Sequence, residues 1–304
     1  MAKLVREIVK EDIPEIEALL LKVFGSGDYK DIKRLGGMTN RSYKITKMDG
    51  SEYLARIPGE GTEALINRLD ERKSTELACR LGIDSDLLYF GDDGKKVMKF
   101  IEISQAISSE LLKNRENIKQ AADIFRKLHT CGEDTGVRFE VFEMAAMYEH
   151  LVDIGGVKLY SDYFDIKKTV MTIKSEVDAN GISERVPCHN DSLVDNWVLS
   201  NKGKLYLIDW EYSGMNEPMW DLSCLSIEAE YSEAEDVVLL EFYFQHEPTV
   251  EEKKMFLAAK LYVDYLWTLW GLTRVPYDGQ FMQEYADERY LRLKRNIEAY
   301  NKVK

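Results

Sequence analysis

The chain has 304 residues, of which 45% are hydrophobic and 31% are charged, and its formal net charge is −13 at pH 7. This length exceeds what one small core needs and is enough for two lobes that share a cleft. The acidic balance disfavours nucleic acid and anionic membranes as partners, because both would be repelled, and it is compatible with a cationic substrate.

Four cysteines occur, and none forms a C-x-x-C pair or has a histidine at metal-ligand spacing. We therefore expect neither a zinc site nor a disulfide framework. The N-terminus is charged and lacks an apolar signal core, and no stretch approaches the ~18 apolar residues of a membrane span. These features predict a soluble cytoplasmic protein with reduced thiols.

The first third of the sequence predicts an antiparallel sheet together with two helices. Apolar residues recur at helical spacing from Ile13 to Phe24, and Gly25 ends that helix. A β meander with turns at Gly36-Gly37 and Asp49-Gly50 follows. The expected strands are 32–35, 43–45, 53–57, 86–90 and 96–103, and the second helix is expected at 62–81 with Gly82 as its C-cap.

Helical periodicity dominates the remainder, apart from a β-rich island at 186–209. That island contains a predicted hairpin, Trp197–Ile208, with its turn at Asn201-Lys202-Gly203. We place a boundary near Ile103-Ser104, so the predicted domains are 1–103 and 104–304, and the predicted fold class is α+β. The expected helices are 108–131, 139–152, 161–179, 219–230, 232–244, 249–273 and 279–302.

The pattern with the clearest chemistry lies in the island. His189, Asp191 and Asn196 form H-x-D-x-x-x-x-N, and a strand ending in Asp209 follows 13 residues after Asn196. In phosphoryl transfer, a carboxylate orients the attacking hydroxyl and accepts its proton, and oxygen ligands hold Mg²⁺ against the triphosphate of ATP. We therefore predict that Asp191, Asn196 and Asp209 are catalytic, the last two as Mg²⁺ ligands. A loop with a purely structural role is the alternative.

Two patterns in the first third fit nucleotide binding. Gly36 and Gly37 would let the backbone approach phosphate closely, and Thr39 or Asn40 could donate to phosphate oxygens. A plain hairpin turn would also explain that glycine pair. Arg56 lies on the third strand, where a kinase needs a cation over the phosphates.

That cation needs a carboxylate on the following helix to hold it. Glu71 is the predicted partner of Arg56, with Glu63 and Glu76 as alternatives. An ordinary surface face of the helix would explain all three glutamates.

A third group of residues fits an ammonium substrate. Trp267 and Trp270 share one face of a predicted helix with Asp264, while Tyr212 and Glu228 follow the metal-binding segment. Aromatic faces and a carboxylate suit a quaternary ammonium, which carries charge but no hydrogen-bond donor. Two tryptophans buried in an ordinary helical core are the alternative.

Taken together, these segments resemble choline/ethanolamine kinases, especially their LicA-like bacterial branch. The resemblance runs from about residue 30 to residue 275, and such proteins are similar in fold to aminoglycoside phosphotransferases and protein kinases. The segments that carry it are GGMTNRSYKI, YLARIPGEGTEALINR, HNDSLVDNWVLS and LIDWEYSGMNEPMWDLS. The helix at 161–179 matches nothing in the family pattern.

The resemblance implies a two-lobed fold, a nucleotide-binding lobe followed by a catalytic and substrate-binding lobe, and transfer of phosphate from ATP to choline. It implies that Asp191 is the base and that Arg56 replaces the usual kinase lysine. Leu193 stands where the family has a polar residue, which puts one substrate contact in doubt. The implied phosphate loop holds Gly37, Thr39 and Asn40, the implied Mg²⁺ ligands are Asn196 and Asp209, and the implied ammonium site holds Tyr212, Glu228, Trp267 and Trp270.

Several alternatives stay open at this point. The acceptor could be ethanolamine, an aminoglycoside or thiamine instead of choline, and a catalytically inactive nucleotide-binding module is a further possibility. Protein kinase activity is disfavoured, because no A-P-E segment follows Asp209. The sequence does not indicate an oligomeric state.

Overall fold

The structure, a computed structural model, describes residues 8–35, 40–59, 66–103, 105–179, 181 and 184–303. The chain divides into two compact units. The first combines Met1–Ile107 with Asn196–Ser213, and the second combines Ser108–Asp195 with Gly214–Lys304. The first unit is built on an antiparallel sheet and the second is mostly helical, as the predicted α+β class requires.

The first unit contains a five-stranded sheet in the order β1-β2-β3-β5-β4, with every neighbouring pair antiparallel. The predicted turn at Asp49-Gly50 joins β2 to β3, and the positive φ of Gly50 (86°) is of the kind that glycine adopts at no steric cost. The predicted turn at Gly36-Gly37 lies outside the described residues. The strands are β1 (Asp31–Arg34), β2 (Asn40–Thr46), β3 (Glu52–Pro58), β4 (Leu87–Phe90) and β5 (Lys96–Lys99).

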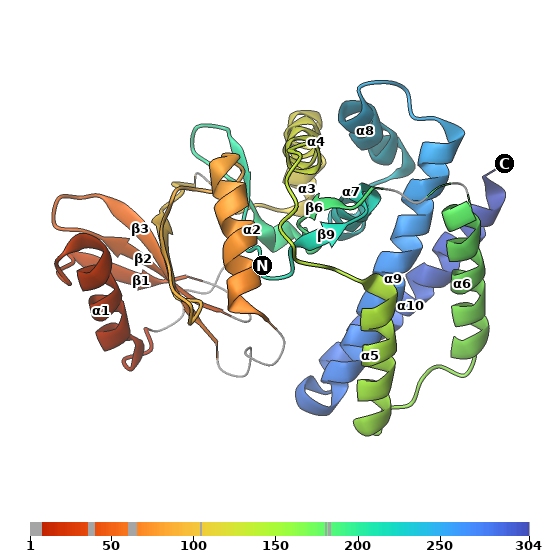
Figure 1. Cartoon of the computed structure of the whole chain (residues 1–304), viewed down its shortest axis with the longest axis horizontal. Coiled ribbons are helices and arrows are strands. Elements are labelled where there is room, and N and C mark those ends of the chain that lie inside the picture. The colour runs from red at the N-terminus through yellow and green to blue at the C-terminus, as the bar shows by residue number, and fades with distance from the viewer. Residues whose placement is uncertain are drawn as a thin grey trace. The chain divides into compact units, whose positions relative to one another are not determined.

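Each face of this sheet carries one helix, as Figure 1 shows for α1 (Asp12–Phe24) and α2 (Arg68–Arg80). Ala55 and Ile57 of β3 pack in one apolar cluster with α1. Arg56 lies between them in sequence and therefore points to the other face, toward α2. Strand alternation thus places an arginine on the face opposite the apolar core.

Helix α2 begins later than the sequence predicted. The side chain of Asn67 caps it by accepting the backbone N–H groups of Leu69 and Asp70, so that the helix starts at Arg68. Gly82, with φ of +65°, follows its end and confirms the predicted C-terminal signal.

The hairpin of β7 (Trp197–Leu199) and β8 (Leu205–Leu207) belongs to the first unit. The backbone N–H of Asn201 donates to the carbonyl of Glu102 at 2.8 Å, and that of Leu207 donates to the carbonyl of Ile83 at 3.2 Å. The predicted second domain, 104–304, is therefore not continuous. The sequence could not show that the hairpin belongs to the first unit, because the two hydrogen bonds join segments about a hundred residues apart.

The second unit is a helical assembly around α9, which packs against α5, α6, α7 and α10 (Figure 1). Its short sheet pairs β6 (Val186–Cys188) with β9 (Gly214–Asn216), a strand that the sequence did not predict. The helices are α3 (Ser109–Leu112), α4 (Arg115–His129), α5 (Val141–Ile154), α6 (Tyr163–Ala179), α7 (Pro218–Glu228), α8 (Glu233–Phe244), α9 (Val250–Asp278) and α10 (Gln280–Lys302).

Local capping explains several of these boundaries. The single helix predicted at 108–131 is divided into α3 and α4, because the side chain of Asn114 caps a new helix start. Reciprocal capping boxes begin both α8, with Ser232 and Glu235, and α9, with Thr249 and Glu252. Within the described residues, no helix is both long and apolar enough to cross a membrane.

Candidate active site

A buried ion pair connects β3 to α2 in the first unit. The Nη1 atom of Arg56 lies 2.5 Å from Oε1 of Glu71, and Arg56 is only 3% exposed. The structure thus selects Glu71 among the three predicted partners. Glu76 instead pairs with Arg72 on the exposed face of α2, and Glu63 lies outside the described residues.

Glu71 also serves two other cations. It lies 2.7 Å from Arg68 and 3.4 Å from Lys96. Burial alone would raise the pKa of Glu71, but the charges of Lys96 and Arg56 and the hydrogen bonds from Arg56 and Arg68 outweigh it and lower the pKa to about 2. The carboxylate is therefore a permanent anchor for the arginine.

Replacing Glu71 with glutamine should lower the free energy of unfolding by about 3–5 kcal/mol, the usual cost of removing one partner from a buried ion pair. Urea denaturation at neutral pH measures this. The low pKa of Glu71 adds stability above the unfolded-state value of about 4.3, and this stability is lost as pH falls toward about 2. The difference between variant and wild type should therefore shrink over that range.

Glu76→Gln is the matched control, because Glu76 lies on the same helix in an exposed pair. We expect it to change stability by less than about 1 kcal/mol. Equal losses in the two variants would contradict an anchoring role for Glu71.

The ion pairs of Glu71 with Arg56, Arg68 and Lys96 form a network that extends through Arg56 to Asp209, a predicted metal ligand. Asp209 lies 3.4 Å from Arg56, and its side chain remains 32% exposed. Its φ of +68° is unusual for a residue other than glycine, and such strained positions persist where the surrounding structure holds them, often at functional sites. Asn196 lies directly across the hairpin, since its carbonyl accepts the backbone N–H of Ile208 at 2.9 Å. The structure thus brings Asn196 and Asp209 to the same end of the hairpin.

Glu211 is a member of this network that sequence reasoning missed. Its Oε2 lies 3.2 Å from Arg68 and accepts a hydrogen bond from Asn40 at 3.0 Å. Burial and then the charge of Asp209 raise the pKa of Glu211, while Asn40 and Arg56 oppose that rise. The available signal was its position two residues after Asp209.

In the second unit, Asp221 of α7 anchors the segment that leads to Asp191. Its carboxylate accepts the backbone N–H groups of His189 and Asn190, both at 2.7 Å. Asn190 adopts a positive φ of 68°, and its carbonyl accepts a hydrogen bond from Trp220 at 2.9 Å. His189 is fully buried, as a loop-holding residue should be. These contacts fix the backbone that carries the half-buried Asp191.

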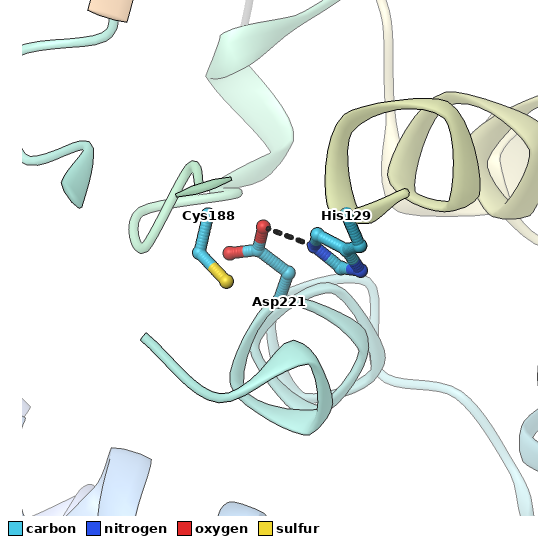
Figure 2. Close-up of side chains that lie close together, drawn as sticks. All are labelled: His129, Cys188 and Asp221. Carbon is cyan, nitrogen blue, oxygen red and sulfur yellow. Dashed lines mark hydrogen bonds and ion pairs between the residues drawn. The ribbon is translucent and has the colours of Figure 1, made fainter. Parts of the chain in front are cut away.

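Figure 2 shows that Asp221 also lies beside His129 and Cys188. His129 binds Asp221 through Nε2 at 3.1 Å and the hydroxyl of Tyr243 through Nδ1 at 2.9 Å. Burial raises the pKa of the Cys188 thiol well above its ordinary value. Because both Asp221 oxygens already accept hydrogen bonds and the thiol keeps its proton, this group supports the loop and is a poor metal site.

The predicted tryptophans form an aromatic cluster with a third ring. Trp267 and Trp270 meet edge to face, with ring centroids 5.8 Å apart, and Trp270 meets Tyr285 of α10 in the same way at 5.8 Å. Burial raises the pKa of Tyr285, and the charges of Glu228 and Asp191 raise it further. Asp191 and Glu228 therefore lie within electrostatic range of Tyr285. We call Trp267, Trp270 and Tyr285 the aromatic cluster.

Asp264, which the sequence predicted to line the ammonium site, is instead bound by other side chains of the protein. It is fully buried, and Arg292 donates to it from Nε at 3.0 Å and from Nη2 at 2.7 Å. Asn296 also donates to it at 3.0 Å. Helical spacing correctly put Asp264 near Trp267 but could not reveal that α10 supplies its counter-charge. We therefore leave Asp264 out of the substrate site.

The structure describes some of the remaining predicted site residues and not others. Asn40 begins β2, while Gly36, Gly37 and Thr39 lie outside the described residues. Tyr212 belongs to the first unit and Glu228 ends α7 in the second.

An antiparallel sheet that carries a buried arginine–glutamate pair, and a helical unit that anchors the Asp191 loop, define a protein-kinase-like fold. A family model described as choline/ethanolamine kinase matches residues 32–269. The chain belongs to the choline/ethanolamine kinase family, whose members are small-molecule kinases.

Individual relatives agree with this assignment. Protein LicA of Haemophilus influenzae is 27% identical over 262 residues, which cover 84% of this chain and 76% of LicA. The crystal structure of a choline/ethanolamine kinase family protein from Mesorhizobium loti is 32% identical, with a TM-score of 0.82 over 94% of both chains. Choline kinase LicA from Streptococcus pneumoniae is 29% identical, with a TM-score of 0.79 over 96% of this chain and all of LicA.

Proposed function

We propose that this enzyme transfers the γ-phosphate of ATP to the hydroxyl group of choline, giving phosphocholine, with Mg²⁺ as its metal. The observation that carries the proposal is the place of Asp209, which pairs with the anchored Arg56 and lies across the hairpin from Asn196. Membership of the choline/ethanolamine kinase family supports the acceptor class, and a LicA structure solved with AMP, 29% identical to this chain, supports an adenine nucleotide as the donor.

Asn196 and Asp209 fit a magnesium ion. An amide oxygen and a carboxylate are the hard oxygen donors that Mg²⁺ prefers, and Asp209 is exposed enough for one oxygen to face a ligand. Bound there, Mg²⁺ would supply positive charge to the phosphates of ATP. Arg56 adds a second positive charge, and the phosphate loop would contribute Gly36, Gly37, Thr39 and Asn40.

Asp191 is the proposed catalytic base. Its carboxylate would align the acceptor hydroxyl for in-line attack and take up its proton as the bond to phosphorus forms. Catalysis would then depend mainly on positioning and on electrostatic stabilisation. The backbone anchors at His189 and Asn190 support this role, because they fix the loop before the substrate arrives.

The aromatic cluster and Glu228 are the proposed site for the ammonium group, with Tyr212 included on the strength of the family resemblance. Ring faces attract a quaternary ammonium without needing a hydrogen-bond donor. Ethanolamine is the second candidate, because Glu228 binds Arg289 through Oε1 and its Oε2 could accept a hydrogen bond from a primary ammonium. Three aromatic rings argue against an aminoglycoside, whose site would be lined mainly by carboxylates.

The decisive test is ADP release with choline, ethanolamine, an aminoglycoside and thiamine as acceptors. We expect choline to give the highest kcat/KM. The neutral isostere 3,3-dimethylbutan-1-ol should react with a much higher KM, because it keeps the shape of choline without its charge. Preference for ethanolamine would replace choline by the second candidate, and no stimulation by any of these alcohols would refute the proposed function.

A further inference from the structure

Arg289 of α10 connects two groups of the proposed ammonium site. Its Nη2 atom lies 2.5 Å from Oε1 of Glu228, and its guanidinium carbon lies 4.5 Å from the centre of the Tyr285 ring. Arg289 is only 4% exposed. A single buried side chain therefore contacts both the carboxylate and one of the rings that would face an ammonium group.

The guanidinium of Arg289 lies closer to Glu228 than to Asp264, its other acidic neighbour. Asp264 lies 3.7 Å from Nη1 of Arg289, and Asp264 is already held by Arg292 and Asn296. Burial alone would lower the pKa of Arg289, but the charges of Glu228, Tyr285 and Asp264 and the hydrogen bond to Glu228 together outweigh it, and the pKa is raised. Arg289 is thus a permanent cation whose shortest contact is to Glu228.

We propose that Arg289 is a positioning residue of the acceptor site, whose guanidinium holds the Glu228 carboxylate and the Tyr285 ring in place to receive the ammonium group. The proposal rests on the proposed function of the chain. Arginine suits this task because its flat guanidinium can stack on a ring with its face while it donates a hydrogen bond from its edge. A lysine would keep the charge but could not do both.

Glu228 has a mostly acidic surrounding apart from Arg289. Arg289 and Tyr285 on α10, Cys224 on its own helix and Asp264 on α9 lie within electrostatic range of Glu228, and Asp191 lies within range of the same Tyr285 and Cys224. Without Arg289, a half-buried carboxylate among other carboxylates would hold its proton to a higher pH. Its attraction for an ammonium group would then weaken as the pH falls.

The test compares steady-state kinetics of wild type, Arg289→Met and Arg289→Lys over a range of pH around neutrality. We expect Arg289→Met to raise KM for choline roughly tenfold or more, the size of one charge-assisted hydrogen bond, with KM for ATP nearly unchanged. This KM should rise further as the pH falls, whereas that of 3,3-dimethylbutan-1-ol should not. Arg289→Lys should keep the raised KM for choline but restore the flat pH profile.

Two further variants separate positioning from folding. Arg292→Met is the matched control, because Arg292 lies on the same helix and binds Asp264, which we leave out of the substrate site. The double variant Arg289→Met/Glu228→Gln removes both charges of the pair, so it keeps the test available if Arg289→Met does not fold. In the double variant, we expect a raised KM for choline that no longer depends on pH.

Four results would overturn the inference: an unchanged KM for choline in Arg289→Met, equal rises in the KM values of choline and ATP, the same profile in Arg292→Met, or a pH-dependent KM in the double variant. Failure of the proposed function is distinct from these. In that case the wild type itself would release no ADP with choline or ethanolamine, and both proposals would fall together.

Discussion

Replacing Asp191 with asparagine is expected to lower kcat for choline phosphorylation by about 10²–10⁴-fold, the usual contribution of a positioned general base. Asparagine keeps the shape of the side chain but cannot accept the hydroxyl proton. The KM for ATP should change little, because Asn40 and Arg56, which are proposed to hold the phosphates, belong to the first unit, whereas Asp191 belongs to the second. Choline-dependent ADP release under saturating ATP measures the effect.

Asp195→Asn is the matched control for this variant. Asp195 lies four residues further along the same segment and is exposed. We expect its replacement to change kcat by no more than about twofold, since an exposed carboxylate at this position has no partner role in the proposed chemistry. Full activity in Asp191→Asn, or an equal loss in Asp195→Asn, would end the assignment of Asp191 as the base.

Replacing Asp209 with asparagine should reduce kcat/KM by roughly 10²–10³-fold, because the positive charge of the metal that Asp209 would hold is worth several kcal/mol to phosphoryl transfer and each 1.36 kcal/mol is a factor of ten. Asparagine is the appropriate replacement here. The φ of Asp209 is +68°, and asparagine tolerates this backbone conformation better than alanine. The variant therefore removes charge without adding backbone strain.

The readout for Asp209→Asn must separate loss of metal from loss of the contact with Arg56. Mn²⁺ binding in the presence of ADP, followed by electron paramagnetic resonance, reports the metal directly. We expect weaker Mn²⁺ binding and a higher Mg²⁺ requirement in the variant. Lost activity with unaltered Mn²⁺ binding would show that Asp209 acts through Arg56 and is not a metal ligand.

The order of helices and strands follows closely from local patterns in the sequence. Alternation in β3 placed Arg56 between two core residues, and the terminal glycines at Gly25 and Gly82 were correctly interpreted as helix ends. The strand β9 escaped prediction because it is three residues long and pairs with β6, far away in the sequence. Short strands carry too little periodicity to stand out.

The candidate site residues also divide into those that a local sequence pattern predicted and those that only a tertiary contact could select. H-x-D-x-x-x-x-N and the later Asp209 were recognisable because their spacing is itself the signal, and the structure places Asn196 and Asp209 at one end of a hairpin. Glu71 could not be separated from Glu63 and Glu76 by sequence, since all three lie in one segment. The structure distinguishes Glu71 from the other two, because Glu71 is buried in an ion pair with Arg56.

The sequence by itself indicated the fold class, through the periodicity of its apolar residues, and the family, through the resemblance of its segments. It also supplied the candidate residues for the proposed chemistry. Only the tertiary structure decided which charges meet. Helical spacing shows which side chains share a face, but not which helix covers that face. Here α10 covers it. Asp264 is therefore paired with Arg292, while Arg289 contacts Glu228 and Tyr285, and Tyr285 packs against Trp270.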